Sequence, residues 1–215
     1  MSVIERLACS LGRRDEVPNQ ELAADVAAKN DKDSVKELVE NLTVKNKNIR
    51  HDCIKTVYEI GYLKPALIAE YFADFLALID DKDNRMQWGA MTALSSIISE
   101  KPKEIFSALG KIIDAADRGS VITRDHCVRI LVGLSSNAQY AGKTFPLLNE
   151  QLLTCPINQV PMYAENALPI ITTENKERFV KTLRLRLDEI EKDSARKRLE
   201  KIIKKLLQLG LDSRN

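Results

Sequence analysis

The pentapeptide Ile49-Arg50-His51-Asp52-Cys53 opens an apolar stretch that recurs along the chain at a fixed spacing. Steps of 37 residues lead to Met86-Gln87-Trp88-Gly89-Ala90, then to Thr123-Arg124-Asp125-His126-Cys127, and finally to Val160-Pro161-Met162-Tyr163-Ala164. Each copy ends on a small residue, and apolar residues follow four and seven positions later. These followers are Val57, Leu94, Leu131 and Leu168, and then Ile60, Ile97, Leu134 and Ile171. Four copies without a shift indicate a repeat protein, and the three- and four-residue spacing of the apolar side chains indicates helices.

The segment before each copy follows the same spacing and is predicted to be the first helix of a pair. Leu38, Phe75 and Ile112 are separated by 37 residues, as are the dipeptides beginning at Lys64 and Lys101. The Pro of each dipeptide suits the first turn of a helix, where its missing N–H costs nothing. Ser34-Val35-Lys36-Glu37 has the pattern of a capping box. Polar turns at 45–48, 80–84 and 117–120 separate the two helices of each pair.

The two ends of the chain depart from this spacing. Leu199, Ile203 and Leu206 match Ala164, Leu168 and Ile171 only if the fifth connection is shorter, at 35 residues. Residues 1–30 resemble a helical pair outside the register, as terminal repeats often do. The sequence therefore predicts one all-α domain over 1–215, an α-solenoid of about five antiparallel helical pairs. It comprises a helical cap at 1–30, regular repeats at 31–175 and a basic capping pair at 176–215.

Composition gives no general case for a polyanionic partner or a membrane. Hydrophobic residues make up 44% of the chain, charged residues 30% and aromatic residues 5%, with a formal net charge of +2. Basic residues nevertheless gather near the end, with 12 basic and 6 acidic side chains in 176–205. No apolar run approaches the length of a membrane span, and the first residues lack the pattern of a signal peptide. The four cysteines show no CxxC spacing, so we expect reduced thiols and a cytoplasmic location.

The second helix of each pair opens with an apolar residue, an Arg, two further residues and a small residue. Ile49-Arg50-x-x-Cys53 and Thr123-Arg124-x-x-Cys127 match this pattern, whereas Gln87 and Pro161 replace the Arg in the other copies. With acidic or amide residues in the preceding turn, these pairs resemble the HEAT-repeat superfamily of armadillo-like α-solenoids. The resemblance covers about 31–207. It implies a solenoid fold and, since members differ widely in function, it leaves the function open.

The register also predicts which side of each second helix stays free. On a helix that turns about 100° per residue, Cys53, Val57 and Ile60 form the core arc, and four other positions lie opposite. Stacked second helices would join these positions into one stripe, which resembles the concave face of HEAT arrays. The four rungs of this stripe are His51, Lys55, Tyr58 and Tyr62; Trp88, Thr92, Ser95 and Ser99; Asp125, Arg129, Val132 and Ser136; and Met162, Asn166, Pro169 and Thr173.

The stripe is the candidate partner-binding site. It contains the single Trp and two of the five Tyr on a face that amphipathicity would make polar, and Trp, Tyr, Arg and Met are enriched at interfaces. The predicted contact residues are His51, Lys55, Tyr58, Tyr62, Trp88, Thr92, Asp125, Arg129, Met162 and Asn166. The alternative is that the aromatic side chains pack against neighbouring helices or loops.

The sequence contains no recognisable motif for catalysis or metal binding. His51-Asp52-Cys53 and Asp125-His126-Cys127 bring ligand types together, but consecutive helical residues diverge and do not converge on one ion. Both cysteines occupy the small core position, where a thiol behaves as a small hydrophobe. There is no phosphate-binding Gly-rich loop, nucleophile elbow or HExxH motif. We therefore expect no enzyme activity, metal, cofactor or small-molecule substrate.

The sequence thus favours a non-catalytic protein–protein interaction module or scaffold. The alternative function is a DNA-binding HEAT-like protein related to alkylation-repair glycosylases, which use concave aromatics and an acidic residue; Trp88 and Asp125 occupy the same stripe position in adjacent copies. One Trp and a nearly neutral stripe weigh against nucleic acid, because duplex binding favours a basic groove. Ser194–Leu207 forms a basic amphipathic segment, which is interpreted as a terminal cap or, alternatively, as an anionic docking or membrane-surface site.

Overall fold

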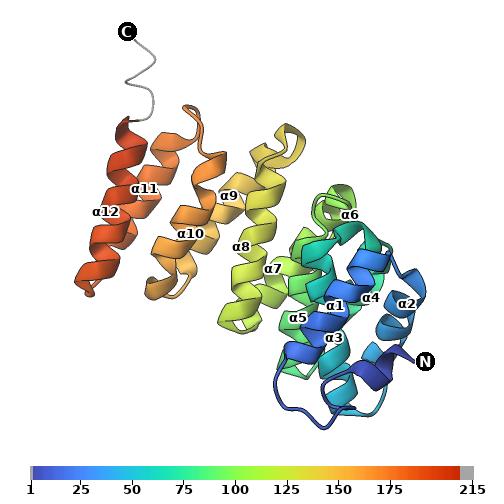
Figure 1. The fold of residues 1–215 in the computed structure, drawn as a ribbon. Helices are drawn as coiled ribbons and strands as arrows, with labels where there is room; N and C mark the ends of the chain where they lie inside the picture. The colour runs from blue at the N-terminus through green and yellow to red at the C-terminus, as the bar shows by residue number, and fades with distance from the viewer. Residues whose placement is uncertain (1, 209–215) are drawn as a thin grey trace. The chain divides into compact units, whose positions relative to one another are not determined.

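The structure, a computed structural model, describes residues 2–208. Within this part of the chain every regular element is a helix and there is no strand, as predicted (Figure 1). None of the helices over 2–208 has the length and apolar character needed to cross a bilayer. The chain divides into two compact units, Met1–Ile130 and Leu131–Asn215.

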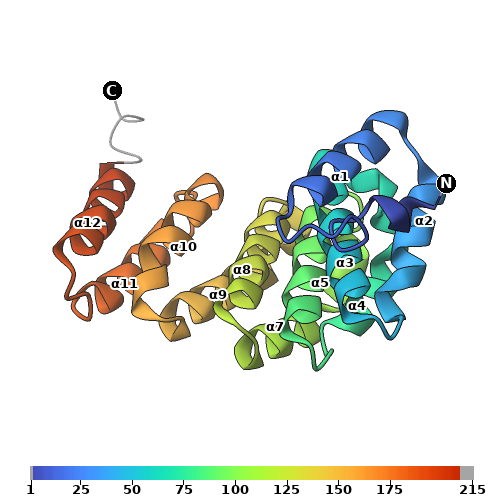
Figure 2. The ribbon, with the colours of Figure 1, turned by 60° about the horizontal axis from the view of Figure 1, so that its bottom comes forward.

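The first unit contains the first two copies of the 37-residue sequence pattern and the beginning of the third. Its elements are η1 (Val3–Arg6), α1 (Val17–Lys29), α2 (Lys32–Glu40), η2 (Asn41–Thr43), α3 (Lys47–Leu63), η3 (Pro65–Leu67), η4 (Ala69–Tyr71), α4 (Phe72–Leu78), α5 (Asn84–Ser96), α6 (Pro102–Ser107) and α7 (Leu109–Arg118). Helix α8 (Val121–Ser135) begins in this unit and ends in the second. Helix α3 packs between α1 and α5, with α2 against α3 and α4 against α5 (Figure 2).

Burial confirms the 37-residue spacing in the first three copies. Cys53, Ala90 and Cys127 have no exposed surface, and the apolar residues four and seven positions after each are also buried. Leu38, Phe75 and Ile112 of the preceding helices are fully buried as well. The small residues allow close approach: a Cβ added at Gly89 would lie 2.7 Å from a side-chain atom of Ile54.

Hydrogen bonds at the turns repeat with the same spacing. Asn46 and Asp83, which are 37 residues apart, are the N-caps of α3 and α5, and Ser120 Oγ, a further 37 residues on, accepts from the Thr123 N–H. Arg50 Nε donates to Leu42 O at 2.9 Å and Gln87 Nε2 donates to Ile79 O at 3.0 Å. Gln87 therefore performs the backbone-capping role of the Arg that it replaces in the pattern.

Two predictions near the N-terminus are wrong in detail. The capping box at Ser34 does not form, because α2 begins earlier: Asp31 is its N-cap and accepts from the Ser34 N–H at 3.0 Å. Glu37 instead accepts from Val3 N–H at 3.0 Å and from the Ser2 hydroxyl. The expected helical pair over 1–30 is one short 3-10 turn followed by α1.

The second unit contains α9 (Ala138–Thr154), η5 (Ile157–Gln159), α10 (Val160–Ala167), η6 (Leu168–Ile170), α11 (Lys176–Leu187) and α12 (Asp193–Gln208). Helix α9 packs against α10 and α11, and α12 packs against α10 and α11. Leu199, Ile203 and Leu206 are buried, as the 35-residue spacing of the fifth copy predicts. Arg186 of α11 is buried and donates to Leu152 O, Leu153 O and Cys155 O, so it caps the end of α9.

The fourth copy departs from the predicted register after Ala167. Helix α10 ends there, Leu168 and Ile171 are only half-buried, and Ile171 is extended. Pro169 explains the early end, since it supplies no backbone N–H to continue the α-helical hydrogen bonds, and the chain goes on as the 3-10 turn Leu168–Ile170. Ala164 remains fully buried.

Candidate functional site

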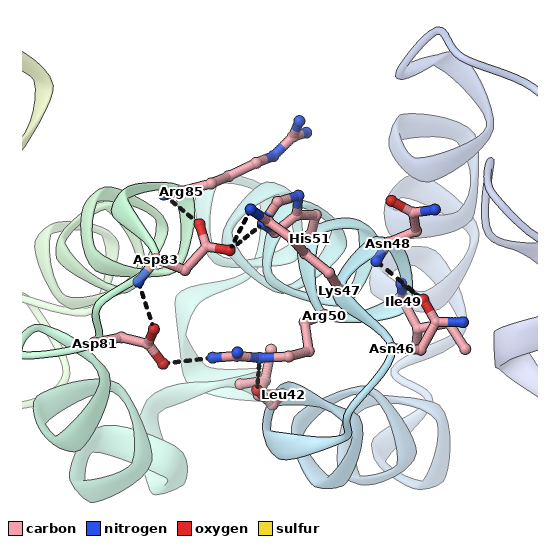
Figure 3. Close-up of polar contacts among 10 residues, drawn as sticks. All are labelled: Leu42, Asn46, Lys47, Asn48, Ile49, Arg50, His51, Asp81, Asp83 and Arg85. Atoms are coloured by element: carbon pink, nitrogen blue, oxygen red, sulfur yellow. Dashed lines mark hydrogen bonds and ion pairs between the residues drawn. The ribbon is translucent and has the colours of Figure 1, made fainter.

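A ladder of ion pairs fixes α3 beside α5 at their N-terminal ends, next to the first stripe position (Figure 3). Arg50 pairs with Asp81, whose Oδ1 also accepts from the Asp83 N–H at 2.8 Å. His51 Nε2 lies 2.8 Å from Asp83 Oδ2, and Lys47 Nζ lies 3.3 Å from the same oxygen. Burial alone would raise the pKa of Asp83, but hydrogen bonds from His51, the Arg85 N–H and Lys47 lower it to about 2. The His51 side chain therefore links α3 to Asp83, the N-cap residue of α5.

Further along the same two helices, three aromatic rings of the stripe form one cluster. The ring of Tyr58 lies 6.1 Å from that of Tyr62 and 5.9 Å from that of Trp88, at interplanar angles of 69° and 51°. Tyr58 is buried at the base, Trp88 is half-buried and Tyr62 is 48% exposed. Tyr58 thus packs inside the unit, as the alternative reading expects, while Tyr62 and Trp88 present surface to solvent, and their role at an interface stays a prediction.

Lys55 was expected to be exposed on the stripe, but the structure shows that it is buried. Its Nζ lies 2.7 Å from Glu59 Oε1, 2.9 Å from Glu16 Oε2 and 5.0 Å from the centre of the Tyr58 ring. Burial opposes the charged ammonium, but hydrogen bonds to Glu59 and Glu16 outweigh it and raise the pKa of Lys55. The helical wheel placed Lys55 away from the core correctly. It could not show that Glu16, outside the register, closes over this position.

The residues of the second and third rungs within the first unit range from buried to exposed. Thr92 is buried, and its hydroxyl is satisfied by donating back to Trp88 O at 2.8 Å. Ser95 Oγ lies 2.9 Å from His126 Nδ1 and so links α5 to α8. Asp125 is half-buried and Arg129 is exposed. Arg129 also lies close enough to offset part of the burial effect that raises the pKa of Tyr62.

The stripe positions of the second unit are described separately. Met162 is half-buried and Asn166 is exposed on α10. Pro169 and Thr173 are exposed but lie beyond the end of that helix. The candidate face therefore has an aromatic part on α3 and α5, and a separate part on α10.

Sequence reasoning missed three residues that shape the site. Glu59 had a signal, because it stands four residues after Lys55, the spacing of a helical ion pair. No sequence signal pointed to Glu16, since it lies in the irregular segment before α1. His126 is buried by the neighbouring helix, and that burial, followed by the charge of Arg129, lowers its pKa to about 4.

The two triplets considered for metal binding are accounted for by packing. Cys53 and Cys127 are fully buried, and burial raises the pKa of the Cys127 thiol to about 12. Over the described range 2–208, no group of three His, Cys, Asp or Glu side chains could hold a metal ion.

Comparison with known proteins gives a likeness of fold alone. No family model matches the sequence, and no curated protein matches it. Two crystal structures of engineered proteins are similar. One has a TM-score of 0.61 at 20% identity, covering 98% of this chain and 100% of its own. The other has a TM-score of 0.57 at 21% identity, covering 97% of this chain and 98% of its own.

Proposed function

We propose that this chain is a non-catalytic protein-interaction module, an α-solenoid of about five HEAT-like helical pairs. A partner protein binds along the face formed by the second helices. The observation that carries this proposal is the aromatic cluster on α3 and α5, which leaves Tyr62 48% exposed beside a half-buried Trp88. Aromatic side chains of this kind supply much of the binding energy at protein interfaces.

The surroundings of the cluster support a preorganised binding surface. The Tyr58 ring contacts the ammonium group of Lys55, and Lys55 is held in place by ion pairs with Glu16 and Glu59. Rings that are already ordered lose little conformational entropy when a partner binds. Tyr62 can therefore contribute contact area without first being positioned.

The solenoid part of the proposal is supported by the repeated geometry within the first unit. The N-caps and the backbone-capping side chains Arg50 and Gln87 recur every 37 residues. Helices α1, α3 and α5 lie side by side there, which is the arrangement that makes second helices form a common surface.

The first test compares two exposed neighbours on α3. The tagged chain is used to capture proteins from native cell extract, captured proteins are identified by mass spectrometry, and affinity for the recovered partner is then measured with purified variants. Tyr62→Ala is expected to weaken binding by about 2 kcal/mol or more. Leu63→Ala, which removes a side chain that is 59% exposed but outside the stripe, should change binding by less than about 0.5 kcal/mol. Equal effects of the two changes would contradict the proposal.

A second comparison addresses charge and the competing class of function. Arg129→Glu should change the association rate and its salt dependence more than it changes stability. The same protein preparation is titrated with duplex DNA containing an alkylated base. Strong, salt-dependent binding of that duplex, with no protein partner captured, would favour the DNA-binding alternative.

A further inference from the structure

The fifth copy extends the stripe to α12, where its residues have a different chemistry. The 35-residue spacing that aligns Ala164 with Leu199 also aligns Met162 with Lys197, Asn166 with Lys201 and Pro169 with Lys204. Helices α10 and α12 pack against each other within the second unit. The stripe position is therefore lysine three times in succession on the last described helix; these three residues are called the lysine rung.

The lysine rung is solvent-exposed, and the nearby Glu165, whose pKa is lowered mainly by its hydrogen bond with Arg198 and also by the charge of Lys201, is already paired with Arg198. Lys197, Lys201 and Lys204 are all exposed, while Leu199, Ile202, Ile203 and Leu206 bury the opposite side of α12. Within residues 2–208 none of these three lysines makes an ion pair, although the arginines of the same helix do. Arg198 pairs with Glu165 of α10, and Arg196 pairs with Glu200 and Asp188. Intramolecular pairing thus neutralises the edges of α12 and leaves the centre of its outer face positive.

We propose that the lysine rung binds an acidic segment of the partner protein. This inference rests on the proposed function, because it assigns a chemistry to the stripe positions of the second unit. Carboxylates spaced along an extended or helical segment can each approach one ammonium, since side chains four apart on a helix lie about 6 Å from each other. The neighbouring Met162 offers an adaptable apolar contact for a side chain between those carboxylates.

A protein segment fits these observations better than a nucleic acid or a membrane. The adjacent stripe residues on α10, Met162 and Asn166, are uncharged, so the positive charge of the lysine rung does not continue across the stripe to α10, whereas duplex binding favours a broad basic surface. A membrane-surface helix inserts its apolar face into the lipid boundary. That face of α12 is already buried against α10 and α11.

The test uses the purified full chain and a fluorescein-labelled peptide of Glu and Asp residues interrupted by Leu. Fluorescence anisotropy gives its dissociation constant at about 0.05 M and about 0.15 M salt, since screening separates exposed charge contacts from apolar ones. The K197Q/K201Q/K204Q variant is compared with K45Q/K82Q/K103Q, which removes the same charge from three other exposed lysines. A charge-retaining variant, K197R/K201R/K204R, checks that loss of binding follows charge. Circular dichroism checks that all three variants are folded.

The expected result is about tenfold weaker peptide binding for K197Q/K201Q/K204Q, with less than about twofold change for K45Q/K82Q/K103Q. The arginine variant should retain the wild-type affinity. Absence of peptide binding by the wild-type chain, or equal losses in both glutamine variants, would overturn the proposal. So would tighter binding to a random duplex DNA, or to vesicles containing phosphatidylserine, than to the peptide. The proposed function fails separately, if Tyr62→Ala leaves partner binding intact.

Discussion

The two buried cysteines of the register are packing residues, and their substitution should be costly. Cys53→Ser places a hydroxyl in a fully buried apolar site, so the free energy of unfolding should fall by about 1–3 kcal/mol in urea denaturation. Cys9→Ser is the control, because Cys9 is only partly buried, and it should cost less than about 1 kcal/mol. Thiol reagents should label Cys53 and Cys127 only after unfolding. Rapid labelling of both in the folded protein would contradict their assignment to the core.

His126 should make stability depend on pH. Its pKa is lowered to about 4 in the folded protein, whereas an unfolded histidine titrates near 6.5. Between these values the unfolded chain binds a proton that the folded chain does not, so stability falls as pH decreases from about 6.5 to about 4, by about 3 kcal/mol in total. His126→Asn retains a polar group near Ser95 without titrating. Chemical denaturation across this range should show a flatter profile for the variant; parallel profiles would argue against a neutral buried histidine.

At the scale of the element, the end of α9 depends on a side chain from another helix. Arg186 is 6% exposed and donates to three backbone carbonyls at that end. Helix ends need such donors because their last carbonyls have no partner within the helix. Arg186→Ala should therefore lower the free energy of unfolding by about 2–4 kcal/mol. Arg184→Ala, two residues earlier and exposed, should change it by less than about 0.5 kcal/mol, and similar losses in thermal denaturation would contradict this role.

Sequence periodicity predicted which helix positions are buried, but it did not predict where two of the helices begin or end. Spacing alone predicted the buried positions of α3, α5 and α8, because packed helices bury the same arc in every copy. It failed after Ala167, where Pro169 ends α10 while the apolar pattern continues to Ile171. It also failed at Asp31, which caps α2 three residues before the predicted start. Local backbone chemistry decided both boundaries.

At the scale of the whole molecule, the all-helical class and the core of the repeats could be predicted from the sequence, but the open area of the stripe could not. Lys55, Tyr58 and Thr92 lie off the core arc and are nevertheless buried. Glu16 pairs with Lys55, the ring of Tyr58 packs against that of Trp88, and the Thr92 hydroxyl donates to a carbonyl of its own helix. Contacts between segments distant in sequence leave no periodic signal. The candidate face is therefore concentrated on Tyr62, Trp88 and Arg129 in the first unit.

The most direct test of this account compares Trp88→Ala with Leu94→Ala on the same helix, by measuring both the free energy of unfolding and the affinity for the captured partner. Leu94 is fully buried, so its truncation should lower stability by about 2–5 kcal/mol. Trp88 is half-buried and shares a ring contact with Tyr58, so its truncation should lower stability by about 1–2 kcal/mol, less than that of Leu94, while weakening partner binding by about 2 kcal/mol or more. A Trp88→Ala variant that unfolds as readily as Leu94→Ala, or that binds the partner as tightly as the unmodified chain, would contradict the account.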